Sequence, residues 1–431
     1  MLLYIHVPFC RERCSYCAFY SVPLCQRPKA EDDGFSQENR IVRPSLGSPL
    51  PSSASDLASR FADNICLEMA KRREDLEPTC LTSIFFGGGT PSLLSPADVR
   101  QIITEASKLF NFSESIEITL EGNPESLNQR DHFTGLREAG VNRLSFGVQT
   151  FDDAALRLLG RLHTAEEATE AVSMARKCGF SNVGIDLIWG IPLHKDAPST
   201  STQQDRTAPQ RAMLDRWLHT LHMAVNLNPD HISAYGLTLE QETPLHRMHE
   251  QGDLVMPDED TASSMFLEGS ALLESHGYVH YEISNFAKPG KECLHNTGYW
   301  KGVEYLGLGP SATSTIRELR WTTPMNVIAW DKQIITTGAA ARDIEHIGPA
   351  NRLKEKVMLS LRTNAGLDLR HLAQALGHPL CPEQIHLVEE LQASALATFN
   401  GTSLILSKKG MLVSDEIISR FFAFSLDPSL Y

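Results

Sequence analysis

The sequence predicts an α/β protein with a parallel sheet, followed by a small C-terminal α+β domain. Six short apolar runs rich in β-formers alternate with longer amphipathic stretches, which is typical of repeated βα units. This alternation is compatible with an open, doubly wound sheet or with a barrel. Polar and glycine-rich residues follow successive expected strands, and this placement favours a partial (β/α)6 barrel resembling a TIM barrel.

The expected strands and helices alternate through the first 275 residues. The helix expected at 96–110 has clear start signals, because Ser95 is a good N-cap and Pro96 suits the first helical position. The strands are expected at 2–7, 83–86, 115–121, 143–149, 182–189 and 231–239, and the other helices at 57–73, 127–139, 165–178, 212–225 and 260–275.

The last part of the chain follows a different pattern. Helices are expected at 352–361, 369–375, 382–392 and 415–423, with short strands at 404–406 and 411–413. This arrangement resembles a winged helix. The net charge of −14 argues against a nucleic-acid partner. We expect residues 1–240 to form the barrel core, 241–345 an extension of it, and 346–431 a small C-terminal domain.

Composition limits where the protein works. No apolar run reaches the ~18 residues that a membrane span needs, and neither a secretory signal nor a transit peptide is recognisable. Nine cysteines, three of them packed between Cys10 and Cys17, indicate reduced thiols and a metal site in the cytoplasm. Segments near 28–55 and 195–210, rich in Pro, Ser, Thr or charge, are expected to be flexible insertions.

Cys10, Cys14 and Cys17 follow the first expected strand with three and two residues between them. Three thiolates on a cubane [4Fe–4S] cluster leave one iron open for a further ligand. A zinc site with a distant fourth ligand is the alternative. A glycine triplet, 87–89, follows the second expected strand, where it could receive a ligand or simply make a tight turn.

The two motifs together resemble the radical S-adenosylmethionine (SAM) signature. Further motifs follow in order and resemble the oxygen-independent coproporphyrinogen III oxidase family over most of the chain: Tyr4-x-His6-x-Pro8-Phe9-Cys10, Glu121-x-Asn123-Pro124, the run 142–149, Leu159-Gly160-Arg161-x-His163 and Asp186-Leu187-Ile188-x-Gly190. The resemblance implies a [4Fe–4S] cluster on the three cysteines and SAM bound by Tyr4, Gly88, Gly89, Thr90, Glu121, Gln149, Arg161 and Asp186.

The family contains a true oxidase and a haem-chaperone (HemW) branch. The oxidase carries another cysteine where this sequence has Phe19, and an N-terminal extension precedes its first motif. The run His295-Asn296-Thr297-Gly298-Tyr299-Trp300 fits the haem-binding pattern of the chaperone branch. Imidazole can ligate haem iron, and aromatic faces can pack on a porphyrin. A structural histidine beside aromatic residues is the alternative.

The resemblance therefore implies a haem chaperone that holds a [4Fe–4S] cluster and SAM. It would bind haem near His295 and pass haem to an acceptor protein. A membrane-associated acceptor and a homodimer are compatible with the resemblance. Porphyrinogen oxidation by radical chemistry is the second interpretation, and a radical SAM enzyme with an unrelated substrate is the third.

Overall fold

The computed structural model describes residues 1–24, 54–195 and 207–423. Its centre is a twelve-stranded sheet of order β11-β12-β9-β7-β6-β5-β4-β1-β13-β14-β15-β16. All six strands expected in the barrel core are present and run parallel to one another: β1 (Leu2–Val7), β4 (Cys80–Gly88), β5 (Asn111–Gly122), β6 (Arg143–Gln149), β7 (Val183–Trp189) and β9 (His231–Gly236).

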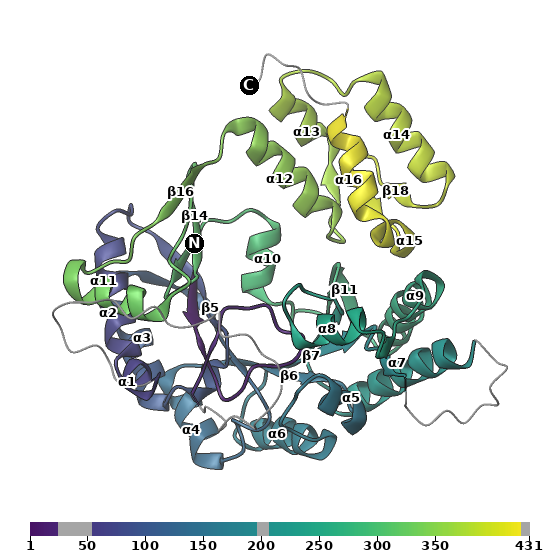
Figure 1. The fold of residues 1–431 in the computed structure, drawn as a ribbon. Helices are drawn as coiled ribbons and strands as arrows, with labels where there is room; N and C mark the ends of the chain where they lie inside the picture. The colour runs from purple at the N-terminus through teal and green to yellow at the C-terminus, as the bar shows by residue number, and fades with distance from the viewer. Residues whose placement is uncertain (25–53, 196–206, 424–431) are drawn as a thin grey trace.

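The order of these strands decides between the two predicted architectures. From β1 to β9 each crossover adds the next strand on the same side, without the reversal that defines a doubly wound sheet. The sheet does not close, because β1 pairs with β13 (Tyr305–Leu308) and β9 pairs with β12 (Asn285–Ala287). The prediction of a partial barrel is confirmed, and Figure 1 shows its helices around the outside of the strands.

The six expected helices of the barrel are present, and two short helices, α5 and α8, were not expected. Ser95 accepts a hydrogen bond from the backbone of Asp98 at the start of α3, as predicted. The expected helix 57–73 is divided at Arg60, whose guanidinium pairs with Asp331 at 2.8 Å. The helices are α1 (Ala54–Ser59), α2 (Phe61–Arg73), α3 (Pro96–Leu109), α4 (Arg130–Ala139), α5 (Asp153–Leu158), α6 (Ala165–Lys177), α7 (Ala208–Asn226), α8 (Pro244–Glu250) and α9 (Glu259–Ser275), with the 3-10 turn η1 (Pro91–Leu93).

Residues beyond 275 complete the sheet. The segment includes β11 (Val279–Glu282), β14 (Thr313–Ile316), β15 (Leu319–Thr322), β16 (Asp343–His346), α10 (Leu294–Trp300) and α11 (Val327–Thr337). Short pairs lie outside the large sheet: β2 (Phe9–Cys10) with β3 (Val22–Pro23), and β8 (Leu193–His194) with β10 (Leu254–Val255). Most of the two expected insertions lies outside the described residues, and α7 begins within the second of them.

The C-terminal domain lies above the barrel in the view of Figure 1. It contains α12 (Pro349–Leu361), α13 (Leu369–Leu376), α14 (Pro382–Ala393), α15 (Lys408–Leu412) and α16 (Ser414–Ala423). Its sheet has the order β17-β19-β18, formed by Leu367–Asp368, Ser403–Leu406 and Ala397–Phe399.

The prediction of a strand at 411–413 is wrong. The side chain of Ser407 accepts a hydrogen bond from the backbone of Gly410, 3.2 Å away, and so starts α15 instead of a second wing strand. Ala397–Phe399, which precedes β19, pairs with it in place of the expected strand.

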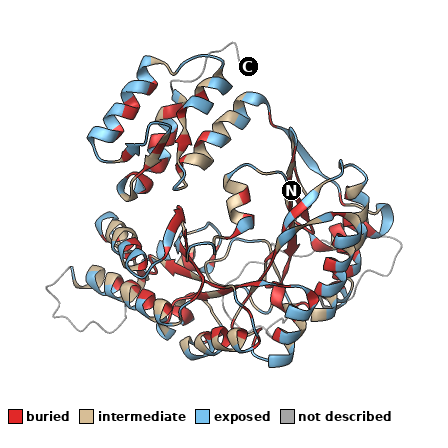
Figure 2. Cartoon of the chain, turned by 180° about the vertical axis from the view of Figure 1, so that it is seen from behind, coloured by how far each residue is buried: buried red, intermediate tan, exposed pale blue. Residues whose placement is uncertain are grey.

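Two separate cores stabilise the two parts, and Figure 2 shows their buried residues in the strands and on the inner sides of the helices. The C-terminal core includes Leu361, Leu404 and Phe421. Phe266 of α9 packs against it, and Lys408 of α15 pairs with Glu274 at 2.8 Å. The domain is therefore attached to the barrel through α9.

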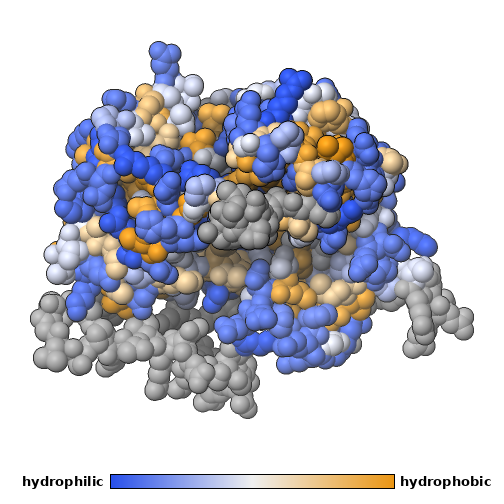
Figure 3. All heavy atoms as spheres, turned by 90° about the horizontal axis from the view of Figure 1, so that it is seen from above, coloured by the Kyte–Doolittle hydropathy of each residue, from blue (hydrophilic) through white to orange (hydrophobic). Residues whose placement is uncertain are grey.

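The surface is mainly hydrophilic on the face shown in Figure 3, with hydrophobic side chains in small patches. Among the described residues, no helix is both long enough and apolar enough to cross a bilayer.

Candidate functional site

The cysteine loop follows β1 and is held by the opposite side of the barrel. The backbone N–H of Ser15 donates to the carbonyl of Leu159 at 3.0 Å, and its hydroxyl donates to the carbonyl of Leu158 at 2.7 Å. Ser15 also accepts a hydrogen bond from the N–H of Leu245, 2.9 Å away. These contacts with the end of α5 and the start of α8 fix the loop between Cys10 and Cys17, whose thiols are half-buried and free of disulfides.

A chain of hydrogen bonds joins two of the three cysteines across the strand ends. The Thr90 hydroxyl lies 3.5 Å from Cys10 Sγ and accepts a hydrogen bond from Asn123 Nδ2 at 3.2 Å. Asn123 Oδ1 accepts from Arg161 Nη2 at 2.6 Å, and Arg161 Nη1 lies 3.4 Å from Cys14 Sγ. These hydrogen bonds connect the ends of several strands to the cysteine loop, as the predicted convergence of the strand ends requires.

Three free thiols on one short loop are the kind of donor that an iron–sulfur cluster needs. Among the described residues, no group of three or more His, Cys, Asp or Glu side chains is gathered closely enough for a single metal ion. A cubane does not need such a group, because each thiolate binds a different iron atom. The zinc alternative needs four ligands on one ion and finds no such set in the described part of the chain.

Close packing against neighbouring residues of the chain requires glycine at positions 88 and 89. A Cβ on Gly89 would lie 2.6 Å from the carbonyl oxygen of Phe9, and Gly88 has φ +108° beside the ring of His6. The N–H of Gly89 donates to the carbonyl of Val7 at 2.7 Å. These glycines let β4 lie against the end of β1, and they bring Thr90 to the cysteine loop.

A cavity of about 140 Å³ lies inside the barrel. The predicted residues Tyr4, Glu121, Asp186 and His295 all line it. The Ser145 hydroxyl lies 3.2 Å from each carboxylate oxygen of Asp186. The structure therefore brings four of the predicted site residues into one small polar space.

Electrostatics in this small cavity favour neutral carboxyl groups. Burial, followed by the nearby Asp186 carboxyl, raises the pKa of Glu121 to about 8. Burial also raises the pKa of Asp186, against the effects of Ser233, Arg143 and Ser145. A carboxyl that keeps its proton can both donate and accept hydrogen bonds, which suits a ligand that bears amine and hydroxyl groups.

Gln149 and Arg161 lie beside the small cavity and do not line it. Gln149 ends β6 in the left-handed region, with φ +67°, and is buried. Arg161 also donates to the carbonyl of Gly147, 2.8 Å away. Arg161 therefore joins β6 to the cysteine loop through Gly147 and Cys14.

The imidazole of His295 is buried, and neither of its nitrogens is free to bind haem iron in this structure. It is 1% exposed, and its Nδ1 lies 2.8 Å from the Ser83 hydroxyl. Its Nε2 lies 3.0 Å from the Tyr299 hydroxyl. Burial and the charge of Arg143 lower the pKa of His295 to about 3, so the ring is neutral and both nitrogens are hydrogen-bonded.

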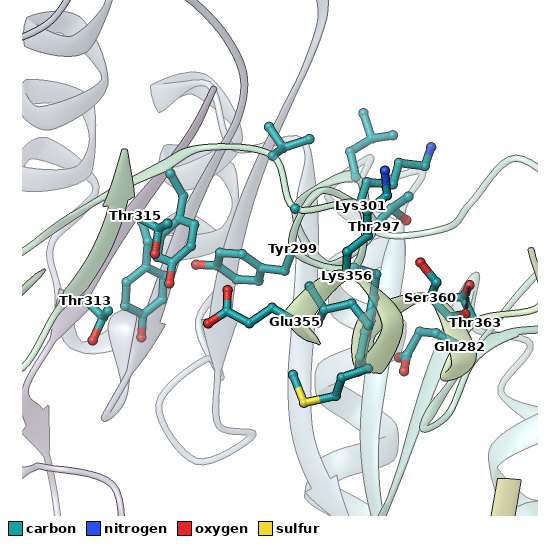
Figure 4. Close-up of a pocket in the computed structure, with 18 of the residues that line it drawn as sticks. Glu282, Thr297, Tyr299, Lys301, Thr313, Thr315, Glu355, Lys356, Ser360 and Thr363 are labelled. Carbon is teal, nitrogen blue, oxygen red and sulfur yellow. Dashed lines mark hydrogen bonds between the residues drawn. The ribbon is translucent and has the colours of Figure 1, made fainter. Parts of the chain in front are cut away.

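A second cavity of about 1210 Å³ lies between the barrel and the C-terminal domain. Tyr4 and Tyr299 line both cavities, so the two spaces share a wall. Trp300 and Tyr305 add aromatic surface, and the ring centroids of Tyr299 and Tyr305 are 4.7 Å apart. Figure 4 shows Tyr299 and the polar side chains that α10, α12 and β14 contribute to this space.

Asn123 was not among the predicted site residues, although the Glu121-x-Asn123-Pro124 motif contains it. The spacing of that motif gave no sign that one amide would bridge Thr90 and Arg161, since both partners come from distant segments. The large cavity was also missed. Its walls come from segments as far apart as Tyr4 and Gly366, and no local pattern joins them.

Family comparisons agree with the motifs. The model for the radical SAM superfamily matches residues 4–198, and the model for the HemN C-terminal domain matches residues 347–413.

Curated relatives cover nearly the whole chain. Radical S-adenosyl methionine domain-containing protein 1, mitochondrial, from Mus musculus is 33% identical, over 96% of this chain and 86% of its own length. Heme chaperone HemW from Bacillus subtilis is 28% identical, over 97% of this chain and 98% of its own length. Heme chaperone HemW from Haemophilus influenzae is 35% identical over 72% of this chain and 69% of its own length.

Among solved structures, coproporphyrinogen III oxidase (HemN) from Escherichia coli, described as a radical SAM enzyme, has a similar fold. The TM-score is 0.74 with 22% identity, over 97% of this chain and 89% of that one. This similarity extends to the fold of both the barrel and the C-terminal domain.

Proposed function

This chain belongs to the radical SAM superfamily and carries the HemN C-terminal domain, and from that premise we propose that it is a haem chaperone. Relatives of similar length are named heme chaperone HemW. Membership of the family implies a [4Fe–4S] cluster and SAM. The observation that carries the proposal for haem is the 1210 Å³ cavity with aromatic walls beside the cluster loop.

We assign Cys10, Cys14 and Cys17 as the cluster ligands. Their thiols are free, half-buried and held on a loop that the rest of the barrel anchors. A cluster held by three thiolates leaves one iron free for SAM and can supply it with an electron. Thr90 and Arg161 place hydrogen-bond donors beside two of the thiols.

We assign SAM to the strand ends that face this loop. The carboxyls of Glu121 and Asp186 suit the amine and hydroxyl groups of such a ligand, and Tyr4 offers a ring at the wall of the small cavity. The complete proposed set is Tyr4, Gly88, Gly89, Thr90, Glu121, Gln149, Arg161 and Asp186.

We place haem in the large cavity. Pockets for ligands of drug size typically have volumes of roughly 300 to 1,000 Å³, so this space is wide enough for a macrocycle. Phe19 lines the cavity and is 69% exposed, so a large apolar side chain is open to solvent there. Burial of Phe19, Trp300 and Tyr299 against a porphyrin face would stabilise the complex.

His295 is the proposed iron ligand. Its Nε2 is bonded to the Tyr299 hydroxyl, and Tyr299 already lines the large cavity. Ligation therefore requires Tyr299 to release that bond. The hydrogen bond from Nδ1 to Ser83 can remain and would orient the ring, as second partners commonly do for metal-bound histidines.

The proposal includes an acceptor protein and a homodimer, because a chaperone must pass its cargo on and the family resemblance is compatible with self-association. The described cysteines are free thiols, which supports a reducing compartment, most simply the cytoplasm.

Haem titration followed by absorbance tests the proposal. We expect wild-type protein to bind haem, and His295→Ala to weaken binding about tenfold and to shift the absorbance maximum through loss of a ligand. Tyr299→Phe frees Nε2 without removing it and should preserve the ligand-dependent spectrum. The exposed His249, away from the cavity, is the matched control, and His249→Ala should bind as wild type.

Two results would contradict the proposed haem-chaperone function. Wild-type protein that binds no haem but converts coproporphyrinogen III to protoporphyrinogen IX would establish the oxidase activity instead. Cleavage of SAM to 5′-deoxyadenosine without any dependence on porphyrinogen would point to a different substrate.

A further inference from the structure

The large cavity carries a set of cationic side chains that the proposed function does not yet use. Lys301, Arg352 and Lys356 line it and are exposed. Within the described ranges, none of the three has a carboxylate within 4.0 Å. By contrast Arg320, also in the wall, is already paired with Glu355 through bonds of 2.6 and 3.0 Å.

These cations come from both sides of the cavity. Lys301 follows α10 at its C-terminal end, on the barrel side. Arg352 and Lys356 are four residues apart on α12 of the C-terminal domain, so they lie on one face of that helix. In Figure 4 the amino groups of Lys301 and Lys356 are drawn on the same side of the cavity.

The acidic groups of the wall do not neutralise this set. Glu355 is occupied by Arg320, and burial raises the pKa of Glu282 to about 7. Glu292 lies before the start of α10, whereas Lys301 lies after its end. At 1.5 Å per residue these two positions are separated by roughly 10 Å or more along the helix.

The chemistry of the cavity is therefore amphipathic. Aromatic surface lies around Tyr299, Trp300 and Phe19, and the positive charges of Lys301, Arg352 and Lys356 lie in the same wall. A flat apolar ring that bears carboxylates would match both parts, since ammonium and guanidinium groups form charge-assisted hydrogen bonds with carboxylates.

We propose that Lys301, Arg352 and Lys356 bind the propionate carboxylates of a tetrapyrrole held in this cavity. The inference rests on the proposed function, because it identifies the groups that recognise the acidic edge of haem. Since the cations come from both parts of the molecule, a bound tetrapyrrole also links α10 of the barrel to α12.

The test compares haem with its dimethyl ester, in which both carboxylates are neutral. We expect wild-type protein to bind haem about tenfold or more tightly than the diester. The triple variant Lys301→Gln, Arg352→Gln, Lys356→Gln should lose this preference by weakening haem binding, while its affinity for the diester stays unchanged.

The matched control is Lys332→Gln, Arg211→Gln, Lys409→Gln, which makes the same charge change at exposed positions that do not line the cavity. It should keep the wild-type preference for haem. A triple variant that still prefers haem, or wild-type protein that binds both porphyrins equally, would overturn the inference alone. Wild-type protein that binds neither would overturn the proposed function and the inference with it.

Discussion

The two cavities of this molecule are built in opposite ways. In the small cavity two of the predicted site residues find partners within the barrel: Asp186 lies against Ser145, and His295 lies between Ser83 and Tyr299. In the large cavity the rings of Phe19 and Trp300 line an open space, and exposed lysines have no carboxylate beside them within the described ranges.

This difference bears on what each site can do. Groups that are already oriented by their neighbours bind a ligand with little further loss of freedom, which suits a resident cofactor. Exposed cations and aromatic faces can gain and release a ligand without disturbing the core, which suits a cargo. Tyr4, Tyr299 and His295 belong to the wall between the two cavities. We therefore expect changes at other residues of one cavity to leave the other largely unaffected.

Removal of one cluster ligand should give the largest effect. Cys14→Ala should abolish the broad iron–sulfur absorbance after anaerobic reconstitution, together with SAM binding, because the cluster loses one of three thiolates. Haem affinity should change less than about twofold if the two cavities act separately. Cys80→Ala, at an exposed cysteine, should keep the cluster. Loss of haem binding in Cys14→Ala would show that the two regions are coupled.

The buried carboxyl of the large cavity should give a pH-dependent effect on stability. Burial raises the pKa of Glu282 from 4.5 to about 7, against hydrogen bonds from Ser284 and Asn285. The folded protein therefore holds a proton that the unfolded chain releases between pH 4.5 and 7, so stability falls as the pH rises through that window. The total loss is roughly 3 kcal/mol.

Glu282→Gln should remove this dependence, so that the variant is more stable than wild type at pH 8 and similar to it near pH 4.5. Thermal unfolding of the cluster-free protein at a series of pH values measures the difference. The exposed Glu318 is the control, since Glu318→Gln should follow the wild-type curve. Parallel curves for wild type and Glu282→Gln would contradict the expected burial of a protonated carboxyl.

The smallest effect is expected at the amide that joins the strand ends. Asn123→Ala removes hydrogen bonds to both Thr90 and Arg161 and should weaken SAM binding about tenfold, measured with the reconstituted protein. Asn123→Asp keeps an acceptor for Arg161 and should give an intermediate affinity. An unchanged affinity in Asn123→Ala at normal cluster content would show that Arg161 is held well enough by Gly147 alone.

Local patterns in the sequence were sufficient for much of the fold. The six parallel strands of the barrel core and the start of α3 at Ser95 could be predicted because residue periodicity and capping act over a few neighbouring positions. Where several local signals competed, the prediction failed. The run 411–413 was expected to be a strand, yet Ser407 begins a helix there.

The sequence by itself determined the cysteine loop, the positions of the barrel strands along the chain and the strand ends on which the site is built, since these follow from spacing along the chain. Only the tertiary structure decided that Asn123 bridges Thr90 and Arg161, that both nitrogens of His295 are occupied, and that α10 and α12 face one cavity. Each of these depends on contacts between residues far apart in the chain, and packing between distant segments leaves no local pattern from which to predict it.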